Sequence, residues 1–562
     1  MTQRLTEDLK ANTLKLVERI AASHKSCVTA ASLYGPSASG YENERSDLHI
    51  LLVLRDYHPQ LRAYHRTMKE VEAYILTVDQ RAFERDVRKG WLGEFAAEKL
   101  TVPYDPLVGG EYLSDQEVEV KRRIVSELLE NLIVECPELS YELRIHPEYF
   151  MYESMMRRAR LFPPLTFRYL NMLRDGLRRK NAEAIMKGYL KALRQLEAAT
   201  HVEFANGYIR ISPKLIRATK SQRVRIPDFL KTFQRAMLFN ILSILPKMMQ
   251  ALLHEEELFS ESQQSPRPRS PLLQLENPRK YLLMPTPLGS VALSDKTTIG
   301  DFVKKAFPNE EVSSMEIEKI GGIINDVYLL KTRRNDIEKK VVVKRFIDWS
   351  GFKWFPLALW TLGTKSFAVR GRSRLERHYT MSKFLHSQGF TVPQVLYVSL
   401  QDRLIFEEFV NGETLVETIK RIIASQGEAT TEIALVKATG QWFAEAHRFS
   451  ISLGDSKPEN IVATGDGRIY FVDFEQATRD GDQVWDIAEF LYYSGHYVSP
   501  VSPATGAEVI AKELINGYIA AGGKAETIKK AGSSRYAKVF GIFTPLHVIL
   551  AISSVCKTVG KT

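Results

Sequence analysis

The chain has 562 residues, of which 44% are hydrophobic and 26% are charged, a composition typical of globular proteins. This composition excludes a disordered or collagen-like chain, and three scattered cysteines are too few for a disulfide framework or a zinc cluster. The net charge of +10 is compatible with an anionic partner. At about 150 residues per domain, we expect three or four folding units in an α+β multidomain protein.

The hydropathy pattern predicts neither a signal peptide nor a membrane span. The first ten residues are polar and contain no apolar core. The longest apolar stretch, 539–555, is interrupted by Pro545 and His547 and is shorter than the run of about 18 residues that indicates a span. We therefore expect a cytoplasmic protein with no membrane partner, and we predict that this stretch is a buried helix.

The first 112 residues are predicted to form a small α/β domain. A helix leads into a short apolar strand at 27–34, and a glycine and serine turn follows at 35–40. Nearly continuous apolar residues at 47–54 indicate a buried strand, and another strand is expected at 71–78. Strands and helices in this order are typical of an α/β domain.

Residues 113–255 have mainly helical periodicity and are predicted to form a helical domain, followed by a linker at 256–275 that is rich in Ser, Gln and Pro. Two basic clusters mark the helical domain. They consist of Arg157, Arg158, Arg160, Arg168, Arg174, Arg178, Arg179 and Lys180, and of Lys214, Arg217, Lys220, Arg223 and Arg225. Two interpretations stay open: solvated helix faces, or a surface that contacts the phosphates of RNA.

The strongest chemical signal lies after the linker, at 276–500, where predicted strands and helices alternate; residues 501–562 are predicted to form a helical extension. A glycine turn opens onto a strand, a second strand ends in a lysine, and two acidic motifs follow. These residues are, in chain order, Gly321, Gly322, Lys344, Asp455, Asn460 and Asp473. Each motif is common by chance, so the information lies in their order.

Phosphoryl transfer needs these residue types. Glycines let backbone N–H groups approach phosphates, and Lys344 would offer them a point charge. Mg²⁺ takes oxygen ligands, which Asn460 and Asp473 supply. Asp455 would accept the hydroxyl proton of the acceptor, and Lys457 would reach the transferred phosphate.

The segment 313–500 resembles the protein-kinase-like superfamily, and most closely its small atypical branches: the kinase of the KEOPS complex, the RIO kinases, and the aminoglycoside and choline phosphotransferases. The resemblance rests on Gly-Asp-x-x-x-x-Asn at 454–460, on the glycine turn at 321–328, and on a hinge-like segment at 404–412. It implies a bilobal kinase-like domain that uses ATP with Mg²⁺ or Mn²⁺ and an unknown phosphoacceptor. The residues that it places around ATP are Gly321, Gly322, Asn325, Val327, Lys344 and Glu408.

Three positions depart from the pattern of these families. Leu453 stands where they have histidine, and Asp473-Phe474-Glu475 replaces Asp-Phe-Gly. The helix glutamate that should pair with the strand lysine is expected at His378, whereas the nearest carboxylate, Glu376, lies on another helix face. Either the helix is offset so that Glu376 serves, or the ion pair of the lysine is missing.

The N-terminal domain resembles the nucleotidyltransferases of the DNA polymerase β superfamily, on Gly35 and Ser37 in the turn and on Asp47 at the start of a strand. That family holds two metal ions with carboxylates at i and i+2 of the strand and with a third acid. Here His49 replaces the second carboxylate, and Glu72 would be the third acid. Imidazole is a poor substitute for carboxylate on Mg²⁺, so we predict a degenerate site with weak or no transfer activity.

Three functions remain open. We predict an ATP- and metal-dependent phosphotransferase, a kinase of the atypical Ser/Thr or small-molecule type, fused to an inactive nucleotidyltransferase-like domain. The second is a double pseudoenzyme that binds RNA and nucleotide as a scaffold or regulator. The third is an active nucleotidyltransferase with a kinase-like accessory domain.

Overall fold

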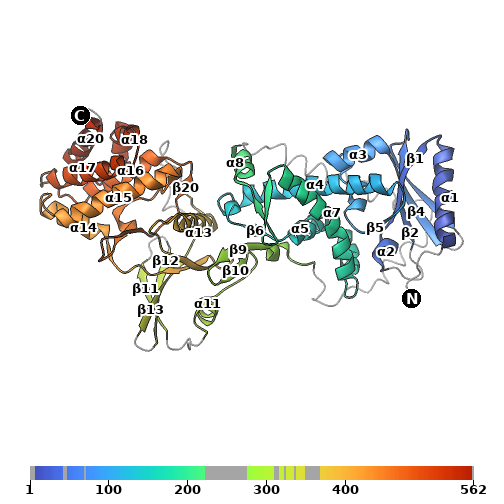
Figure 1. Cartoon of the computed structure of the whole chain (residues 1–562), viewed down its shortest axis with the longest axis horizontal. Coiled ribbons are helices and arrows are strands. Elements are labelled where there is room, and N and C mark those ends of the chain that lie inside the picture. Colours follow the sequence, from blue (N-terminus) through green and yellow to red (C-terminus); the bar gives the residue numbers. More distant parts are fainter. Residues whose placement is uncertain are drawn as a thin grey trace. The chain divides into compact units, whose positions relative to one another are not determined.

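The computed structural model describes residues 7–41, 47–68, 71–221, 275–308, 315–321, 325–334, 337–348 and 368–559. They belong to two compact units, Met1–Leu283 and Met284–Thr562, here called the N-terminal and the C-terminal unit. Both units combine helices with sheets, which confirms the predicted α+β multidomain class (Figure 1). In the described part of the chain, no helix combines the length and the apolar composition that crossing a bilayer requires.

The N-terminal unit begins with a five-stranded sheet in the order β3-β4-β2-β1-β5. Its strands are β1 (Cys27–Tyr34), β2 (Leu48–Arg55), β3 (Leu61–Met68), β4 (Val71–Asp79) and β5 (Tyr104–Val108). Strands β2 and β4 run parallel, and the other neighbours run antiparallel. Helix α1 (Glu7–Ser23) buries Val17 and Ile20 against one face of this sheet (Figure 1). The strands predicted at 27–34, 47–54 and 71–78 are confirmed.

Helices follow the sheet in the N-terminal unit, as predicted. They are α4 (Gly110–Glu135), α5 (Glu148–Leu161), α6 (Pro164–Met172), α7 (Arg178–Ala198) and α8 (Pro213–Ser221). Two further helices, α2 (Pro36–Ser39) and α3 (Gln80–Lys89), lie between strands of the sheet in the sequence. Three short strands interrupt the helices from α4 to α8, β6 (Arg144–Ile145), β7 (Val202–Ala205) and β8 (Tyr208–Ile211). Strand β6 also pairs with the first residues of β9 (Leu282–Thr286). The chain just after the predicted linker therefore belongs to the N-terminal unit up to Leu283.

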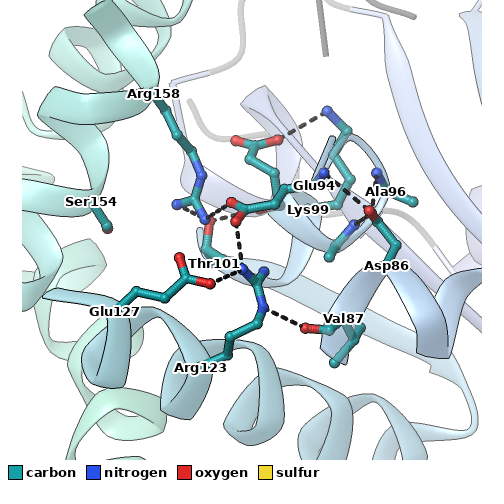
Figure 2. Close-up of polar contacts among 12 residues, drawn as sticks. Asp86, Val87, Glu94, Ala96, Lys99, Thr101, Arg123, Glu127, Ser154 and Arg158 are labelled. Atoms are coloured by element: carbon teal, nitrogen blue, oxygen red, sulfur yellow. Dashed lines mark hydrogen bonds and ion pairs between the residues drawn. The ribbon is translucent and has the colours of Figure 1, made fainter. Parts of the chain in front are cut away.

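A buried ionic network joins the α/β part of the N-terminal unit to its helices. Figure 2 shows Glu94, which follows α3, between Arg123 of α4 and Arg158 of α5, at 2.7 and 2.8 Å. The carboxylate of Asp86 accepts four backbone N–H groups from residues 92–97. These ion pairs cross the domain boundary predicted at residue 112.

The C-terminal unit contains a five-stranded antiparallel sheet in the order β11-β12-β13-β15-β14. Its strands are β11 (Glu316–Gly321), β12 (Asp326–Arg334), β13 (Ile337–Arg345), β14 (Val395–Ser399) and β15 (Leu404–Glu408). Helix α13 (Gly371–Ser387) comes between β13 and β14 in the sequence, and β10 (Gly289–Ala292) and α11 (Ile299–Ala306) precede the sheet. The predicted strand ending at Lys344 is confirmed as part of β13.

Helices dominate the rest of the C-terminal unit. They are α14 (Leu415–Ala424), α15 (Thr430–Arg448), α16 (Gln483–Gly495), α17 (Thr505–Ala520), α18 (Ala525–Ala531), α19 (Ser534–Phe540) and α20 (Leu546–Thr558). Five short strands accompany these helices: β16 (Glu413–Thr414) before α14, and β17 (Ile451–Ser452), β18 (Ile461–Ala463), β19 (Ile469–Phe471) and β20 (Thr478–Arg479) between α15 and α16. Strands β16, β18 and β19 form one sheet, and β17 pairs with β20. One apolar core contains residues from α14 through α20, so the helical extension completes this core.

The prediction of one buried helix across 539–555 is wrong. Helix α19 ends at Phe540, and α20 begins only after Pro545, which lacks a backbone N–H and caps the second helix. Leu546 and Leu550 of α20 are 71% and 62% exposed, because only the opposite face of this helix reaches the core.

Candidate active site

Lys344 lies on β13, the central strand of the antiparallel sheet, and its side chain is 12% exposed. Its Nζ is 3.1 Å from Oε2 of Glu407 on β15 and donates to the backbone carbonyl of Val472 at 2.5 Å. Burial acts to lower the pKa of Lys344, but the carboxylates of Glu407 and Asp473 outweigh it and raise the pKa. The lysine is therefore held as a charged group inside the unit.

The carboxylate partner of Lys344 comes from the sheet, so the expectation that Glu376 could serve is wrong. Helix α13 is not offset: His378 faces the lysine site, whereas Glu376 pairs with Arg372 on the same helix at 3.0 Å. The alternative, a missing ion pair, is also wrong, because Glu407 supplies it. The missed signal is an acidic residue directly after the apolar run Leu404-Ile405-Phe406, where burial requires a partner.

His378 connects helix α13 to both sides of the site. Its Nε2 lies 2.6 Å from Oε1 of Glu407, and its Nδ1 accepts the backbone N–H of Phe474 at 3.2 Å. The same Nδ1 lies 3.4 Å from Oδ1 of Asp473. A ring that carries its proton on Nε2 donates to Glu407 and accepts from Phe474, so His378 ties the lysine pair to the Asp-Phe-Glu segment.

Glu475, which stands where the related pattern has glycine, anchors the same helix. Its Oε2 accepts from Arg374 of α13 at 2.9 Å and from the amide of Asn325 at 2.6 Å. Arg374 also donates to Oδ1 of Asn325 at 2.9 Å. The prediction that Asn325 contacts ATP is not supported by these bonds, since both polar atoms of its amide are used by protein groups.

Asp455 lies in the loop between β17 and β18, together with Lys457 and Asn460. The Lys457 Nζ is 3.2 Å from Oδ1 of Asp455, and the amide of Asn460 donates to the Asp455 backbone carbonyl at 2.9 Å. Burial acts to lower the pKa of Lys457, but Asp455 and Glu489 outweigh it and raise the pKa. The structure thus brings the three predicted residues of this loop together.

A buried carboxylate on α16 binds the backbone at the start of this loop. Asp486 accepts the backbone N–H groups of Leu453 and Gly454, each at 2.7 Å. It also contacts Nε2 of His447 on α15 at 3.2 Å. Leu453 is buried in the core, so apolar packing occupies the position where the kinase-like families that the segment resembles have histidine.

Asp473 and Asn460 carry the oxygen atoms that could hold a metal ion. Burial acts to raise the pKa of Asp473, but the neighbouring His378 and the charge of Lys344 outweigh it and hold the pKa well below its usual range. The Asn460 amide nitrogen is used by Asp455, which leaves the carbonyl oxygen as the ligand atom. Carboxylate and amide oxygens are donors that Mg²⁺ accepts. Within the described ranges, no cluster of three or more His, Cys, Asp or Glu side chains could hold a metal ion.

Gly321 of the predicted glycine turn ends the edge strand β11 of the same sheet, whereas the predicted hinge includes β15, which lies between β13 and β14. Gly321 ends β11 opposite Val327, and Val327 lies opposite Lys344 in the next strand pair. Glu408 ends β15, and its backbone N–H donates to Gln394 at 3.0 Å. Gly322 lies outside the described residues.

The second predicted site, in the N-terminal unit, has its residues on neighbouring strand ends. The parallel register pairs His49 of β2 with Tyr74 of β4, so Asp47 and Glu72, two residues earlier on each side, come to the same face. Glu72 lies 2.5 Å from Nε2 of His65. Gly35 adopts a positive φ of 80° at the start of α2, and Ser37 lies within α2.

Two cations, Lys99 and Arg168, lie over the ring of Tyr34, which neighbours His49, and positive charge disfavours a divalent metal there. The His49 ring lies between Tyr34 and Tyr74, with ring centroids 5.5 and 5.7 Å away. Burial and the positive charges of Arg168 and Lys99 lower the pKa of His49 to about 4. The arrangement supports the predicted degenerate site.

The predicted RNA surface of the helical domain is wrong for two of its arginines. Arg158 is buried against Glu94, and Arg168 is bound to Glu98 at 3.2 Å with 17% of its side chain exposed. Others are paired at the surface, such as Arg157 with Glu153 at 2.8 Å. Arg223 and Arg225 lie outside the described residues.

No protein-family model matches the chain, and a search of curated proteins finds no match to its sequence.

Proposed function

We propose that the C-terminal unit is a phosphotransferase that uses ATP with Mg²⁺ or Mn²⁺. The observation that carries this proposal is that the buried, charged Lys344 donates to the carbonyl of Val472, the residue before Asp473, while the N–H of Val472 donates to the carbonyl of Asn460 at 3.0 Å. Lys344 lies 3.1 Å from Glu407, and the charge of Asp473 also acts to raise the pKa of Lys344. Such a set of groups neutralises phosphates and holds a metal, which is most of what phosphoryl transfer requires.

Each residue has a chemical task in this proposal. Lys344 binds the α- and β-phosphates of ATP, while Asp473 and Asn460 hold the metal, which would neutralise charge on the β- and γ-phosphates. The acceptor hydroxyl forms a bond to the γ-phosphorus as the bond to ADP breaks, and Asp455 accepts the hydroxyl proton. Lys457, which lies 3.2 Å from Asp455, would contact the transferred group. The acceptor itself is not defined by these residues.

The test is transfer of the γ-phosphate from labelled ATP, measured as ADP formation and as label on the protein. We expect Asp473→Asn to lower the rate by at least about 100-fold, because it removes the charged metal ligand. Asp466→Asn, in an exposed turn where Asp466 pairs with Arg468, is the matched control and should act like wild type. Equal rates in wild type and Asp473→Asn would overturn the proposal. ATP-dependent thermal stabilisation without turnover would favour the pseudoenzyme instead.

In this proposal the N-terminal unit does not transfer nucleotides. The support is the pair of cations, Lys99 and Arg168, that acts on His49 at the position of the second metal-binding acid. Wild type should show no nucleotidyl transfer from an α-labelled nucleoside triphosphate. Transfer by the wild-type protein that His49→Ala does not change would contradict this interpretation of His49.

A further inference from the structure

An open pocket of about 1040 Å³ lies in the N-terminal unit between strand β5 and helix α7. Helix α1 contributes Lys10 to its wall, β5 contributes residues 104–107, and the turn after β1 contributes Ser37 and Gly40. Pockets that bind small ligands have volumes of about 300–1,000 Å³, so this one has room for a molecule of nucleotide size.

The pocket adjoins the degenerate site and shares Ser37 with it. Leu33 lines the pocket, whereas the next residue of β1, Tyr34, contacts His49. Because successive residues of a strand point to opposite faces, the two sites lie on opposite faces of the sheet. Asp47, His49 and Glu72 are not among the residues that line the pocket.

Lysines dominate the charge of the pocket. Lys180, Lys187 and Lys191 follow one another on α7 at intervals of seven and four residues, which places them on one face of the helix. Lys10 comes from α1 on the other side of the pocket. All four side chains are exposed, and none forms an ion pair with a residue that the structure describes.

Two carboxylates line the same pocket, but they do not balance these lysines. Glu117 is already bound by Lys121 at 2.5 Å and by the hydroxyl of Tyr104 at 2.9 Å. Asp105 faces Lys180 and Lys10; burial raises its pKa although both lysines act to lower it. Four ammonium groups therefore share one available carboxylate, which leaves an excess of positive charge in a concave space.

We propose that this pocket binds a small ligand that carries a chain of phosphate groups, either inorganic polyphosphate or the triphosphate of a nucleotide. Lysines provide mobile point charges that follow a phosphate chain, and their spacing along α7 matches an extended anion more closely than a single phosphate. The pocket lies wholly in the N-terminal unit, so this proposal does not depend on the proposed function of the C-terminal unit.

The test is calorimetric titration of the full-length protein with inorganic tripolyphosphate. Two double variants with the same change of charge are compared. Lys187→Gln with Lys191→Gln removes two pocket lysines. Arg179→Gln with Arg194→Gln removes two exposed cations of the same helix that pair with Glu183 and Glu197 and do not line the pocket.

We expect the pocket variant to weaken tripolyphosphate binding by about tenfold or more, since charge-assisted contacts are strong, and the control variant to bind like wild type. Added salt should weaken the binding by wild type. Equal melting temperatures of the two variants verify that both fold.

Absence of binding by wild type, or equal loss in both variants, would overturn the proposal. ATP that binds more tightly than tripolyphosphate, and that loses affinity only in the pocket variant, supports the nucleotide form of the ligand. Binding of an RNA oligonucleotide through these lysines, without binding of tripolyphosphate, would replace the small ligand by a nucleic acid and would also overturn it.

Discussion

Glu407 is the residue on which the candidate active site depends most directly. It contacts Lys344 at 3.1 Å and His378 at 2.6 Å, and its side chain is only 2% exposed. Burial acts to raise its pKa, but His378 and Lys344 outweigh burial and lower the pKa. This buried carboxylate is charged because Lys344 and His378 stabilise its negative charge, so the three side chains depend on one another.

Exchange of the side chains at positions 378 and 407 tests whether Glu407 is the partner of Lys344. Glu407→Gln leaves a buried lysine without its nearest carboxylate, a change that costs about 3–5 kcal/mol in comparable pairs. His378→Glu alone places two carboxylates together and should also lower both the melting temperature and the phosphotransfer rate. The double variant His378→Glu with Glu407→His moves the carboxylate to the helix and should recover part of both losses. A double variant that is as impaired as the worse single variant would show that position 407 acts in another way.

The identity of this partner could not be read from the sequence, although Lys344 could. A strand that ends in lysine is a local pattern, and β13 was predicted from it. The contact with Glu407 depends on the pairing of β13 with β15, which are separated in the sequence by α13 and β14. Side-chain spacing along one helix, which pointed to His378 and Glu376, carries no information about that pairing.

At the level of elements, ion pairs fix how the helices of the N-terminal unit meet its sheet region. Glu94 joins α4 and α5, and Glu98 of the short 3₁₀ helix Ala97–Leu100 binds Lys99 and Arg168. The sequence showed these arginines as a basic run. A run of arginines in the sequence does not show which side chains are buried. That depends on their acidic partners, which lie some 60 or 70 residues earlier in the chain.

These ion pairs make the N-terminal unit sensitive to acid. Burial acts to raise the pKa of Glu98, but Arg168 and Lys99 outweigh it and lower the pKa from 4.5 to about 2. A carboxyl with a depressed folded pKa stabilises the fold fully above pH 4.5, and this contribution, roughly 3 kcal/mol, is lost as the pH falls toward 2. Urea unfolding followed by circular dichroism should show the midpoint falling over this window.

Glu98→Gln provides the comparison for that prediction. It should lower the stability at neutral pH, because it leaves Arg168 and Lys99 without their carboxylate. It should also make the stability depend less on pH between pH 4.5 and pH 2. The same slope in wild type and variant would show that other carboxyls cause the acid sensitivity.

At the scale of the whole molecule, the free cysteines report on each unit separately. Cys27 is exposed, whereas Cys136 is buried in the N-terminal unit and Cys556 in the C-terminal unit. Burial also raises the pKa of Cys556 to about 12, so the thiolate that reacts with labelling reagents is absent in the folded state.

We therefore expect the native protein to react at Cys27 alone. Labelling with a maleimide at increasing urea concentrations, followed by peptide mass spectrometry, should show that Cys136 and Cys556 react only when their own units unfold. Two different midpoints would indicate that the units unfold independently, and Cys27→Ser should remove the native signal without moving either midpoint. Rapid labelling of all three thiols without urea would contradict the buried positions.

The position of the Lys344 carboxylate on a strand also has a consequence for control. A pair formed between β13 and β15 closes when the sheet folds, and it does not wait for a helix to swing inward. Displacement of α13 would remove His378 from Glu407, but the contact between Lys344 and Glu407 would remain within the sheet. Under the proposed function, a switch would therefore act on access to the site or on the Asp-Phe-Glu segment, and the contact between Lys344 and Glu407 would not have to form anew.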